Sequence, residues 1–345
     1  MSDERAPPLP VVFGCAGETL SAAERRFFEG TKPLGFALFA RNCREPDQIR
    51  DLIAALRDSA GNADAPVLID QEGGRVARLR PPRWRTYPAA AHLGALPDPA
   101  AEEAARLGAR LIADDLAALG ITVDAAPVLD LPAEGADPVI GDRAYGSDPV
   151  RVARLGRAVC EGLLAGGVSP IVKHIPGHGR ARVDSHVDCP RVEAERAALA
   201  ERDFAPFRAL ADAPWAMTAH IVYATVDAAL PATLSAPVIG TVIRGEIGFD
   251  GVLISDDICM GALRQGGASP GDPAAAALAA GCDVALHCSG DLREMEAVAE
   301  RLPPLAPAAA ARLARAEALR AASRRPFDRG AAEARFDALL GGGPA

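Results

Sequence analysis

Asp256 ends an apolar run in the segment GVLISDD, where its carboxylate could act as a nucleophile or a base, or could simply cap a helix. Asp257 is its rival for either role. Adjacent side chains on a strand point to opposite faces, so only one of the two can face a shared cavity. Lys173 is one of only two lysines in an arginine-rich chain and lies on another apolar run. Its compact ammonium could donate to sugar hydroxyls, form a Schiff base, or be a buried partner of a carboxylate.

The densest polar stretch is KHIPGHGRARVDSH, which contains three of the six histidines. Asp184 and His186 are two residues apart, so the carboxylate could orient the imidazole for acid and base catalysis. His174 and His178 have a spacing that metal ligands can use on a helix. The proline and glycine between them prevent that helix, so zinc is only weakly indicated and His178 is expected to form hydrogen bonds within the loop.

A second polar stretch, IDQEGGRVARLR, places Asp70, Glu72, Arg75 and Arg78 around two glycines. Asp70 could accept two hydrogen bonds from a polyol, and the arginines would add donors in fixed positions. The alternative is a turn held by surface salt bridges. Arg143, in VIGDRAYGSDP, leaves the same choice open.

These polar residues follow short apolar runs that alternate with helical stretches. Eight such runs are present: Val11–Cys15, Phe36–Ala40, Val67–Asp70, Val123–Leu129, Pro170–His174, Ala216–His220, Val252–Asp256 and Asp283–Cys288. Runs that are apolar on both faces are typical of buried parallel strands. The count of eight predicts an α/β protein with a single closed (β/α)8 TIM-type barrel, and a doubly wound sheet is the alternative. Neither a dinucleotide-binding nor a phosphate-binding loop fingerprint follows any run.

Helices are predicted between the runs, at Glu45–Ser59, Ala101–Leu119, Pro149–Ala165, Arg191–Ala211 and Pro273–Ala280. The polar residues at the ends of the runs are Asp70, Asp130, Lys173, His174, His220 and Asp256. In a barrel all of these ends meet at one rim, where catalytic groups lie. We expect His220 to be a structural histidine with its hydrogen bonds satisfied.

Composition narrows the function further. The chain has 345 residues, of which 37 are Lys or Arg and 46 are Asp or Glu, for a formal charge of −9. This balance argues against nucleic-acid binding. The N-terminus does not resemble a signal peptide, and apolar stretches are too short to span a membrane. Seven scattered cysteines without a paired motif predict a reducing, cytoplasmic environment. We expect one catalytic domain over residues 1–345, with closing helices from about residue 307.

The motifs together resemble those of bacterial β-N-acetylhexosaminidases of glycoside hydrolase family 3, the single-domain NagZ type. The resemblance rests on IDQEGGRV, APVLDL, VIGDRAYGSDP, KHIPGHG with DSH downstream, MTAHIVY, and GFDGVLISDD followed by AAGCDVAL, in this order from about residue 35 to 290. It implies a (β/α)8 barrel. The implied activity is removal of terminal N-acetylglucosamine from peptidoglycan-derived muropeptides during cell-wall recycling in the cytoplasm.

The resemblance also implies roles for individual residues. Asp256 corresponds to the nucleophile of retaining hydrolysis, His186 to the acid/base, and Asp184 to the aspartate that polarises the histidine. The implied sugar-binding residues are Asp70, Arg78, Arg143, Lys173 and His174. No metal or organic cofactor is required, and the expected partner is a small carbohydrate rather than a nucleic acid or a membrane.

Some alternatives remain open. After SDD the chain reads ICMGALRQGG, with glycine where the family has glutamate after the methionine, so the leaving-group side of the site could differ. A broader β-glycosidase or a phosphorylase of the same family would use the same residues. A lysine-dependent aldolase using Lys173 and a non-catalytic sugar sensor are further possibilities.

Overall fold

Eight parallel strands close into a barrel in the computed structural model, which describes residues 7–185, 188–263 and 269–341. The strands are β1 (Leu9–Gly14), β2 (Pro33–Leu38), β3 (Val67–Ile69), β4 (Val123–Asp124), β5 (Ser169–Ile175), β7 (Trp215–Thr218), β9 (Val252–Asp257) and β10 (Val284–His287). Each strand pairs with its neighbour in parallel, and β1 closes the ring against β10. The predicted (β/α)8 barrel is therefore confirmed, and all eight apolar runs contribute strands to it.

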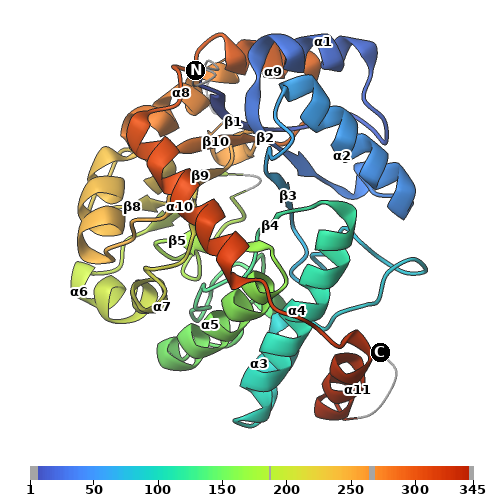
Figure 1. Ribbon diagram of the computed structural model, residues 1–345. Helices are drawn as coiled ribbons and strands as arrows, with labels where there is room; N and C mark the ends of the chain where they lie inside the picture. The colour runs from blue at the N-terminus through green and yellow to red at the C-terminus, as the bar shows by residue number, and fades with distance from the viewer. Residues whose placement is uncertain (1–6, 186–187, 264–268, 342–345) are drawn as a thin grey trace.

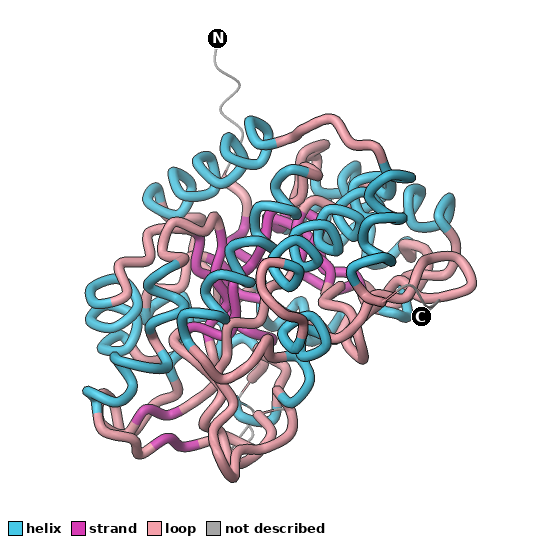
Figure 2. Tube along the Cα trace, turned by 90° about the horizontal axis from the view of Figure 1, so that it is seen from below, coloured by secondary structure: helices cyan, strands magenta, loops and turns pink. Residues whose placement is uncertain are grey.

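Helices surround the strands, as Figures 1 and 2 show. They are α1 (Ala22–Thr31), α2 (Pro46–Ala60), α3 (Ala90–Ala95), α4 (Ala100–Leu119), α5 (Pro149–Ala165), α6 (Arg196–Ala198), α7 (Ala205–Ala209), α8 (Gly271–Ala280), α9 (Leu292–Ala299), α10 (Pro307–Ser323) and α11 (Arg329–Leu339). The helical segments of 3₁₀ or π type are η1 (Ala40–Asn42), η2 (Gly141–Arg143), η3 (Leu199–Asp203), η4 (Ala232–Leu234), η5 (Val238–Glu246) and η6 (Gly261–Leu263). No helix in the described part of the chain has both the length and the apolar character needed to cross a membrane.

Local sequence explains where the helices begin and end. In α5, the Asp148 side chain accepts the N–H of Arg151, and Pro149 occupies the first turn, where its missing N–H costs no hydrogen bond. Helix α2 also begins with a proline, and it ends at Gly61, whose φ of 64° is left-handed. The predicted boundaries of both helices agree with the structure to within one residue.

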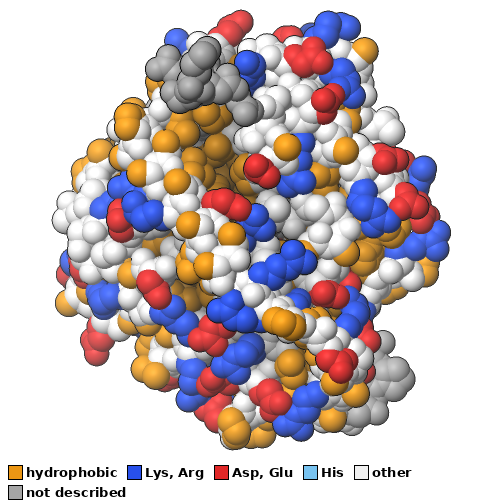
Figure 3. Space-filling view, viewed as in Figure 1, with side chains coloured by type: hydrophobic (Ala, Val, Ile, Leu, Met, Phe, Trp, Pro, Cys, Tyr) orange, Lys and Arg blue, Asp and Glu red, His pale blue; other side chains and the backbone are white. Residues whose placement is uncertain are grey.

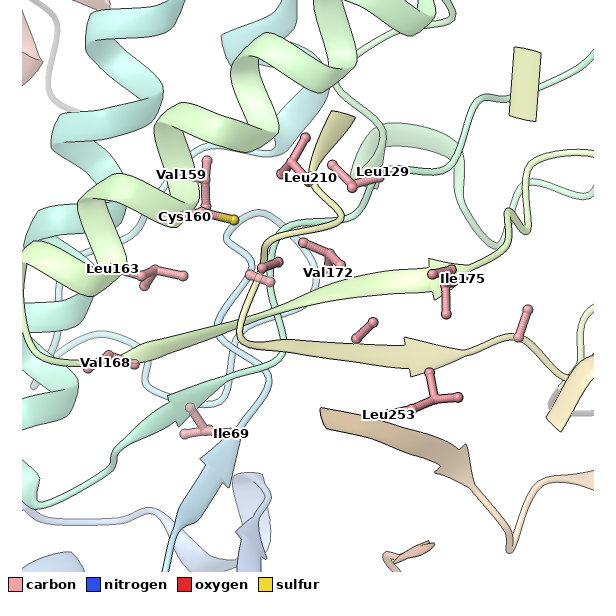
Figure 4. Packing of buried hydrophobic residues seen from close by; sticks show 14 of the residues in the cluster. Ile69, Leu129, Val159, Cys160, Leu163, Val168, Val172, Ile175, Leu210 and Leu253 are labelled. Atoms are coloured by element: carbon pink, nitrogen blue, oxygen red, sulfur yellow. The ribbon is translucent and has the colours of Figure 1, made fainter. Parts of the chain in front are cut away.

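Two hydrophobic layers hold the barrel together. Side chains that alternate along the strands fill the interior, while the opposite faces pack against the helices. Figure 4 shows the outer layer between α5 and β5, where Val159 and Leu163 face the strand that carries Val172. Gly162 lets α4 approach α5 closely, because a Cβ there would lie 2.3 Å from the Arg106 carbonyl oxygen.

Helix α10 closes the N-terminal end of the barrel and crosses the front of the molecule in Figure 1. Its Ala316 belongs to the interior cluster of the barrel, and Leu313 packs against the same cluster. Helices α10 and α11 lie in the segment where the sequence predicts closing helices from about residue 307. Basic and acidic side chains are interspersed on this face (Figure 3).

Two predicted elements are wrong in part. The helix expected over Arg191–Ala211 is broken: Arg191–Val192 form β6, which pairs with β8 (Val222–Tyr223) in a separate two-stranded sheet. Only short helical segments follow, and Pro206, which lacks an N–H, stands at the start of α7. The strand expected over Val123–Leu129 is also shorter, because Pro127 cannot donate to a neighbouring strand and pairing is limited to β4 and one later bridge at Val128.

Candidate active site

A cavity of about 360 Å³ opens at the C-terminal ends of the strands. Seven of the eight predicted site residues line it: Asp70, Arg78, Arg143, Lys173, His174, Asp184 and Asp256. They come from the ends of β3, β5 and β9 and from the loops that follow β3, β4 and β5. The eighth, His186, lies outside the described residues. The rim that the sequence predicted to gather polar side chains therefore does so in the structure.

Asp256 faces the interior of the barrel. Val252 and Ile254 belong to the interior cluster, and alternation along β9 directs Asp256 to the same side. Its Oδ1 accepts the N–H of Asp257 at 2.8 Å. Burial alone would raise the pKa of this carboxyl, but the imidazoles of His220 and His174, together with that N–H, hold the pKa below its usual value. Asp256 is thus ionised at neutral pH.

Asp257 has a different environment, although it also borders the cavity. Its Oδ1 accepts the N–H of Cys259 at 3.0 Å and that of Cys288 at 3.1 Å. These bonds connect the turn after β9 to the end of β10. The geometry distinguishes the two aspartates: Asp256 lies on the strand face that points into the barrel, and Asp257 accepts backbone N–H groups of the surrounding turns.

Lys173 is the centre of a buried charge network. Its Nζ lies 2.9 Å from Asp70 Oδ1 and 2.7 Å from Glu72 Oε1, and the side chain is only 2% exposed. Arg143 binds Glu72 through two hydrogen bonds of 2.7 and 2.9 Å, and Arg78 binds Asp70 at 3.0 Å. The result is a chain of alternating charges along one wall of the cavity.

The network controls protonation. Burial opposes the charged form of every member, yet the Lys173 ammonium holds the pKa of both Asp70 and Glu72 below the usual range. Burial likewise disfavours the charged lysine, but the two carboxylates raise the pKa of Lys173 above its ordinary value. All three groups are charged at neutral pH, and two of them, Asp70 and Lys173, line the cavity and offer an ionic acceptor and an ionic donor to a ligand rich in hydroxyls.

A second buried carboxylate, Asp130, orients the loop after β5. It accepts the N–H of His174 at 3.2 Å and that of His178 at 2.6 Å, and its other oxygen lies 2.7 Å from His174 Nδ1. This contact puts the proton of a neutral His174 on Nδ1, so that Nε2 is a hydrogen-bond acceptor. Both histidines are thus organised by a carboxylate.

His178 extends this arrangement to the predicted catalytic loop. Its Nε2 lies 3.1 Å from Ser185 Oγ, and burial lowers the pKa of His178 to about 4, so its ring is neutral near pH 7. The Ser185 carbonyl also accepts the N–H of Ala262. Since Ser185 directly follows Asp184, these contacts anchor the segment that brings Asp184 to the cavity.

The comparisons with known proteins agree with this architecture. A family model described as the N-terminal domain of glycosyl hydrolase family 3 matches residues 23–317. The chain belongs to glycoside hydrolase family 3. The resemblance to its bacterial β-N-acetylhexosaminidases is confirmed, and with it the prediction of a glycoside hydrolase.

Individual relatives cover most of the chain. A β-hexosaminidase of Alkalilimnicola ehrlichii is 40% identical over 314 residues, which are 89% of this chain and 88% of the relative. One from Pseudomonas aeruginosa is 41% identical over 278 residues, or 79% of this chain and 80% of the relative. The crystal structure of NagZ from Neisseria gonorrhoeae with N-trifluoroacetyl-D-glucosamine superposes with a TM-score of 0.86 at 31% identity, covering 98% of this chain and 99% of that one.

Behind the residues that line this cavity, the geometry makes two residues central to which the sequence assigned no role. Glu72 connects Lys173 to Arg143, and Asp130 connects the two histidines of the loop. A signal was present for both, because Glu72 comes two residues after Asp70 and Asp130 follows an apolar run. What the sequence lacked was the identity of their partners.

The remaining histidine predictions concern His220 and the possible zinc ligands His174 and His178. His220 is fully buried, and its ring nitrogens lie 2.7 Å from Thr233 Oγ1 and 3.0 Å from the Asp257 carbonyl oxygen, so its structural role is confirmed. The weak zinc interpretation of His174 and His178 stays a prediction, since Asp130 or Ser185 engages only one ring nitrogen of each.

Proposed function

We propose that this protein is a retaining exo-β-N-acetylglucosaminidase that acts through a covalent glycosyl-aspartate intermediate. The observation that carries the proposal is the ionised Asp256 carboxylate, which shares one cavity with Asp184 and with the charged wall of Asp70 and Lys173. A carboxylate nucleophile beside a rich set of hydroxyl-binding groups is what glycoside hydrolysis with retention requires.

In the first step, a lone pair of the Asp256 carboxylate forms a bond to the anomeric carbon. The bond from that carbon to the glycosidic oxygen breaks, and its electron pair stays on the oxygen, which takes a proton from His186. The lowered pKa of Asp256 keeps the attacking oxygen free of a proton at neutral pH. The product of this step is an α-linked glycosyl ester of Asp256, while the leaving sugar departs as a neutral alcohol.

In the second step, His186 takes a proton from water, and the water oxygen forms a bond to the anomeric carbon. The ester bond breaks, its electron pair returns to Asp256, and the second inversion restores the β configuration. Asp184 stabilises the imidazolium that donates the proton in the first step and forms again when water is deprotonated in the second. Ser185 and His178 support this role because they fix the backbone next to Asp184.

The buried charges are proposed to bind the terminal sugar. Asp70 accepts from hydroxyl groups, Lys173, Arg78 and Arg143 supply donors from separate elements, and Nε2 of His174 accepts. Because Arg78, Arg143 and Lys173 are already ion-paired and the ring of His174 is held by Asp130, these groups are fixed before substrate arrives. Preorganised donors cost no rearrangement in the transition state.

The proposed natural substrates are muropeptides that carry N-acetylglucosamine on an anhydro-N-acetylmuramic acid, met in the cytoplasm during cell-wall recycling. The support is the naming of the relatives as β-hexosaminidases and the match to NagZ over nearly the whole of both chains. Release of N-acetylglucosamine from such a muropeptide, faster than from a chitin disaccharide, is the expected result with purified enzyme. Equal rates would remove the preference from the proposal.

The alternatives separate on chemistry. The aldolase hypothesis needs a neutral Lys173 amine, but two carboxylates within 2.9 Å favour the ammonium, so this hypothesis is disfavoured. A phosphorylase would transfer the sugar to phosphate and release a sugar 1-phosphate. Parallel assays with and without phosphate, with product analysis, separate that reaction from hydrolysis. A sugar sensor would bind the glycoside without turnover.

The decisive experiment is kcat/KM on an aryl β-N-acetylglucosaminide and on the matching aryl β-glucoside, for wild type and Asp256→Ala. We expect wild type to prefer the N-acetyl substrate and the variant to lose roughly 10³-fold or more, as for a lost nucleophile. Added azide should restore turnover in Asp256→Ala and yield the α-glycosyl azide. Asp142→Asn, which removes a half-exposed carboxylate, is the matched control. A variant as active as wild type, or a β-glycosyl azide, would contradict the assigned nucleophile.

A further inference from the structure

Cys259, His287 and Glu294 bring a thiol, an imidazole and a carboxylate together beside the catalytic end of the barrel. Across residues 7–185, 188–263 and 269–341, this is the one group of three or more potential metal ligands whose ligand atoms all lie within 4.8 Å of one another. None of the three residues lines the catalytic cavity. The cluster is therefore separate from the site described above.

Alternation along β10 places the cluster on the outer side of the barrel wall. Leu286 and Cys288 line the catalytic cavity, so the intervening His287 points to the opposite side. There its ring packs edge-on against the ring of Phe13, with centroids 5.8 Å apart. Catalytic cavity and cluster thus share one strand as a common wall.

The other two side chains come from neighbouring elements. Cys259 lies in the turn after β9, and the hydrogen bonds from Cys259 and Cys288 to Asp257 hold that turn against the end of β10. Glu294 lies in the first turn of α9, where Asp291 accepts the N–H of Glu294 at 3.2 Å and so fixes its backbone. Three separately anchored elements converge on one point.

The distances suit a small tetrahedral ion. Nitrogen and oxygen ligands bound to zinc at about 2.0–2.1 Å with a tetrahedral angle are roughly 3.4 Å apart. His287 Nε2 and Glu294 Oε2 are 3.4 Å apart. The 4.8 Å limit on the contacts that involve the sulfur means that Cys259 would have to move by at most about 1 Å to reach a zinc–sulfur bond of about 2.3 Å.

We propose that Cys259, His287 and Glu294 bind a divalent transition metal ion, and that zinc is the ion that fits best. Thiolate and imidazole ligands favour zinc over magnesium or calcium, which prefer oxygen ligands alone. His287 is fully buried, whereas the Glu294 side chain is 24% exposed and Cys259 is partly exposed, which gives the ion a path from solvent. Three protein ligands leave a fourth position for water.

Bound metal would join the turn after β9, the end of β10 and the start of α9. Since this turn is also held by Asp257, the neighbour of Asp256, the ion would stiffen the backbone behind the nucleophile without touching the substrate. Metal that binds only the folded protein raises the melting temperature. Zinc is therefore expected to raise the Tm, and magnesium is expected to leave it unchanged.

Cobalt(II) tests the proposal directly, because a thiolate bound to cobalt gives a charge-transfer band in the near ultraviolet. Metal-free enzyme with one equivalent of cobalt should show this band, and zinc should displace it. Cys259→Ser should abolish the band and weaken zinc binding by more than roughly 10-fold. Cys43→Ser is the matched control, because Cys43 is also partly exposed but lies elsewhere, and this variant should retain the band. Glu294→Gln should keep the band and weaken zinc binding.

A metal bound at the catalytic loop must be distinguished from this site. Asp184→Asn should leave both the cobalt band and the zinc-dependent rise in Tm intact. The proposal is overturned if wild type shows no band, if the band survives in Cys259→Ser, or if Asp184→Asn removes the rise in Tm while Cys259→Ser retains it.

Discussion

Replacing Glu72 by glutamine tests whether the buried charge network around Lys173 stabilises the fold. Glu72 accepts three charge-assisted hydrogen bonds, at 2.7 Å from Lys173 and at 2.7 and 2.9 Å from Arg143, and its side chain is only 7% exposed. Glutamine retains one acceptor oxygen and turns an NH₂ group toward a cation. Lys173 then has Asp70 as its remaining carboxylate partner, and Arg143 loses the carboxylate that it binds.

Breaking a buried ion pair by removing one partner costs about 3–5 kcal/mol of the free energy of unfolding. For 345 residues, the usual entropy of unfolding per residue converts this cost to a fall in Tm of roughly 4–7 °C. Thermal melting followed by circular dichroism measures it. Asp142→Asn is the control, because Asp142 and its partner Arg75 are each nearly half exposed, and such pairs contribute ~0–1 kcal/mol.

The two variants should therefore separate clearly. If Glu72→Gln melts within a degree of wild type, the network does not stabilise the fold and the reasoning from burial fails. If Asp142→Asn falls as far as Glu72→Gln, burial is not what distinguishes them. Measuring kcat/KM for Glu72→Gln on the same samples then shows whether loss of the carboxylate beside Lys173 also weakens catalysis.

Further expectations concern protons and packing. His178 has a pKa of about 4 in the folded protein and near 6.5 in the unfolded chain, so between pH 7 and pH 5 only the unfolded chain takes up a proton there. The free energy of unfolding should therefore fall by on the order of 2 kcal/mol over this range. Urea unfolding of His178→Asn should show a smaller fall. Asp70 and Glu72 have lowered pKa values, so the stability that they contribute is complete only above about pH 5 and is lost progressively as the pH falls further. Asp184→Asn should lose roughly 10²-fold in kcat/KM on an alkyl glycoside and much less on a nitrophenyl glycoside, and equal losses would argue against proton transfer through this residue. Gly179→Ala should destabilise by roughly 1–3 kcal/mol, because its Cβ would meet the Leu131 carbonyl oxygen at 2.0 Å, whereas Gly240→Ala in η5 has open space and should be neutral or stabilising in the same melting experiment.

The strands were predictable because a strand that is buried on both faces consists almost entirely of apolar residues. Val252 to Ile254 read as a buried strand from their side chains alone, and alternation then directs Asp256 inward. The prediction of a helix from Arg191 was wrong because the structure there depends on a distant segment. Arg191–Val192 pair with Val222–Tyr223, about thirty residues later, and no local sequence pattern predicts this pairing.

Candidate site residues were predictable as individuals but not as partners. Lys173 could be identified as unusual by its rarity, yet whether it is a Schiff-base amine or an ion-paired donor depends on Asp70 and Glu72, about a hundred positions earlier. The cluster of Cys259, His287 and Glu294 has no sequence motif at all, because its members come from three elements. Sequence spacing indicates which residues lie together within one helix, strand or loop. These sites instead combine residues from several elements, which only the closed barrel brings together.

Closure of β1 against β10 also has a consequence for biosynthesis. Val11 pairs with Ala285, so the first strand of the nascent chain lacks one neighbour until 274 more residues have been translated. At 5–20 residues per second this interval is roughly 15–55 s. During that time the hydrogen-bonding edge of β1 is open to chaperones or to other chains on the same messenger, and α10 has not yet been made to seal the barrel. On the ribosome, this enzyme must pass through a long period as an unclosed sheet.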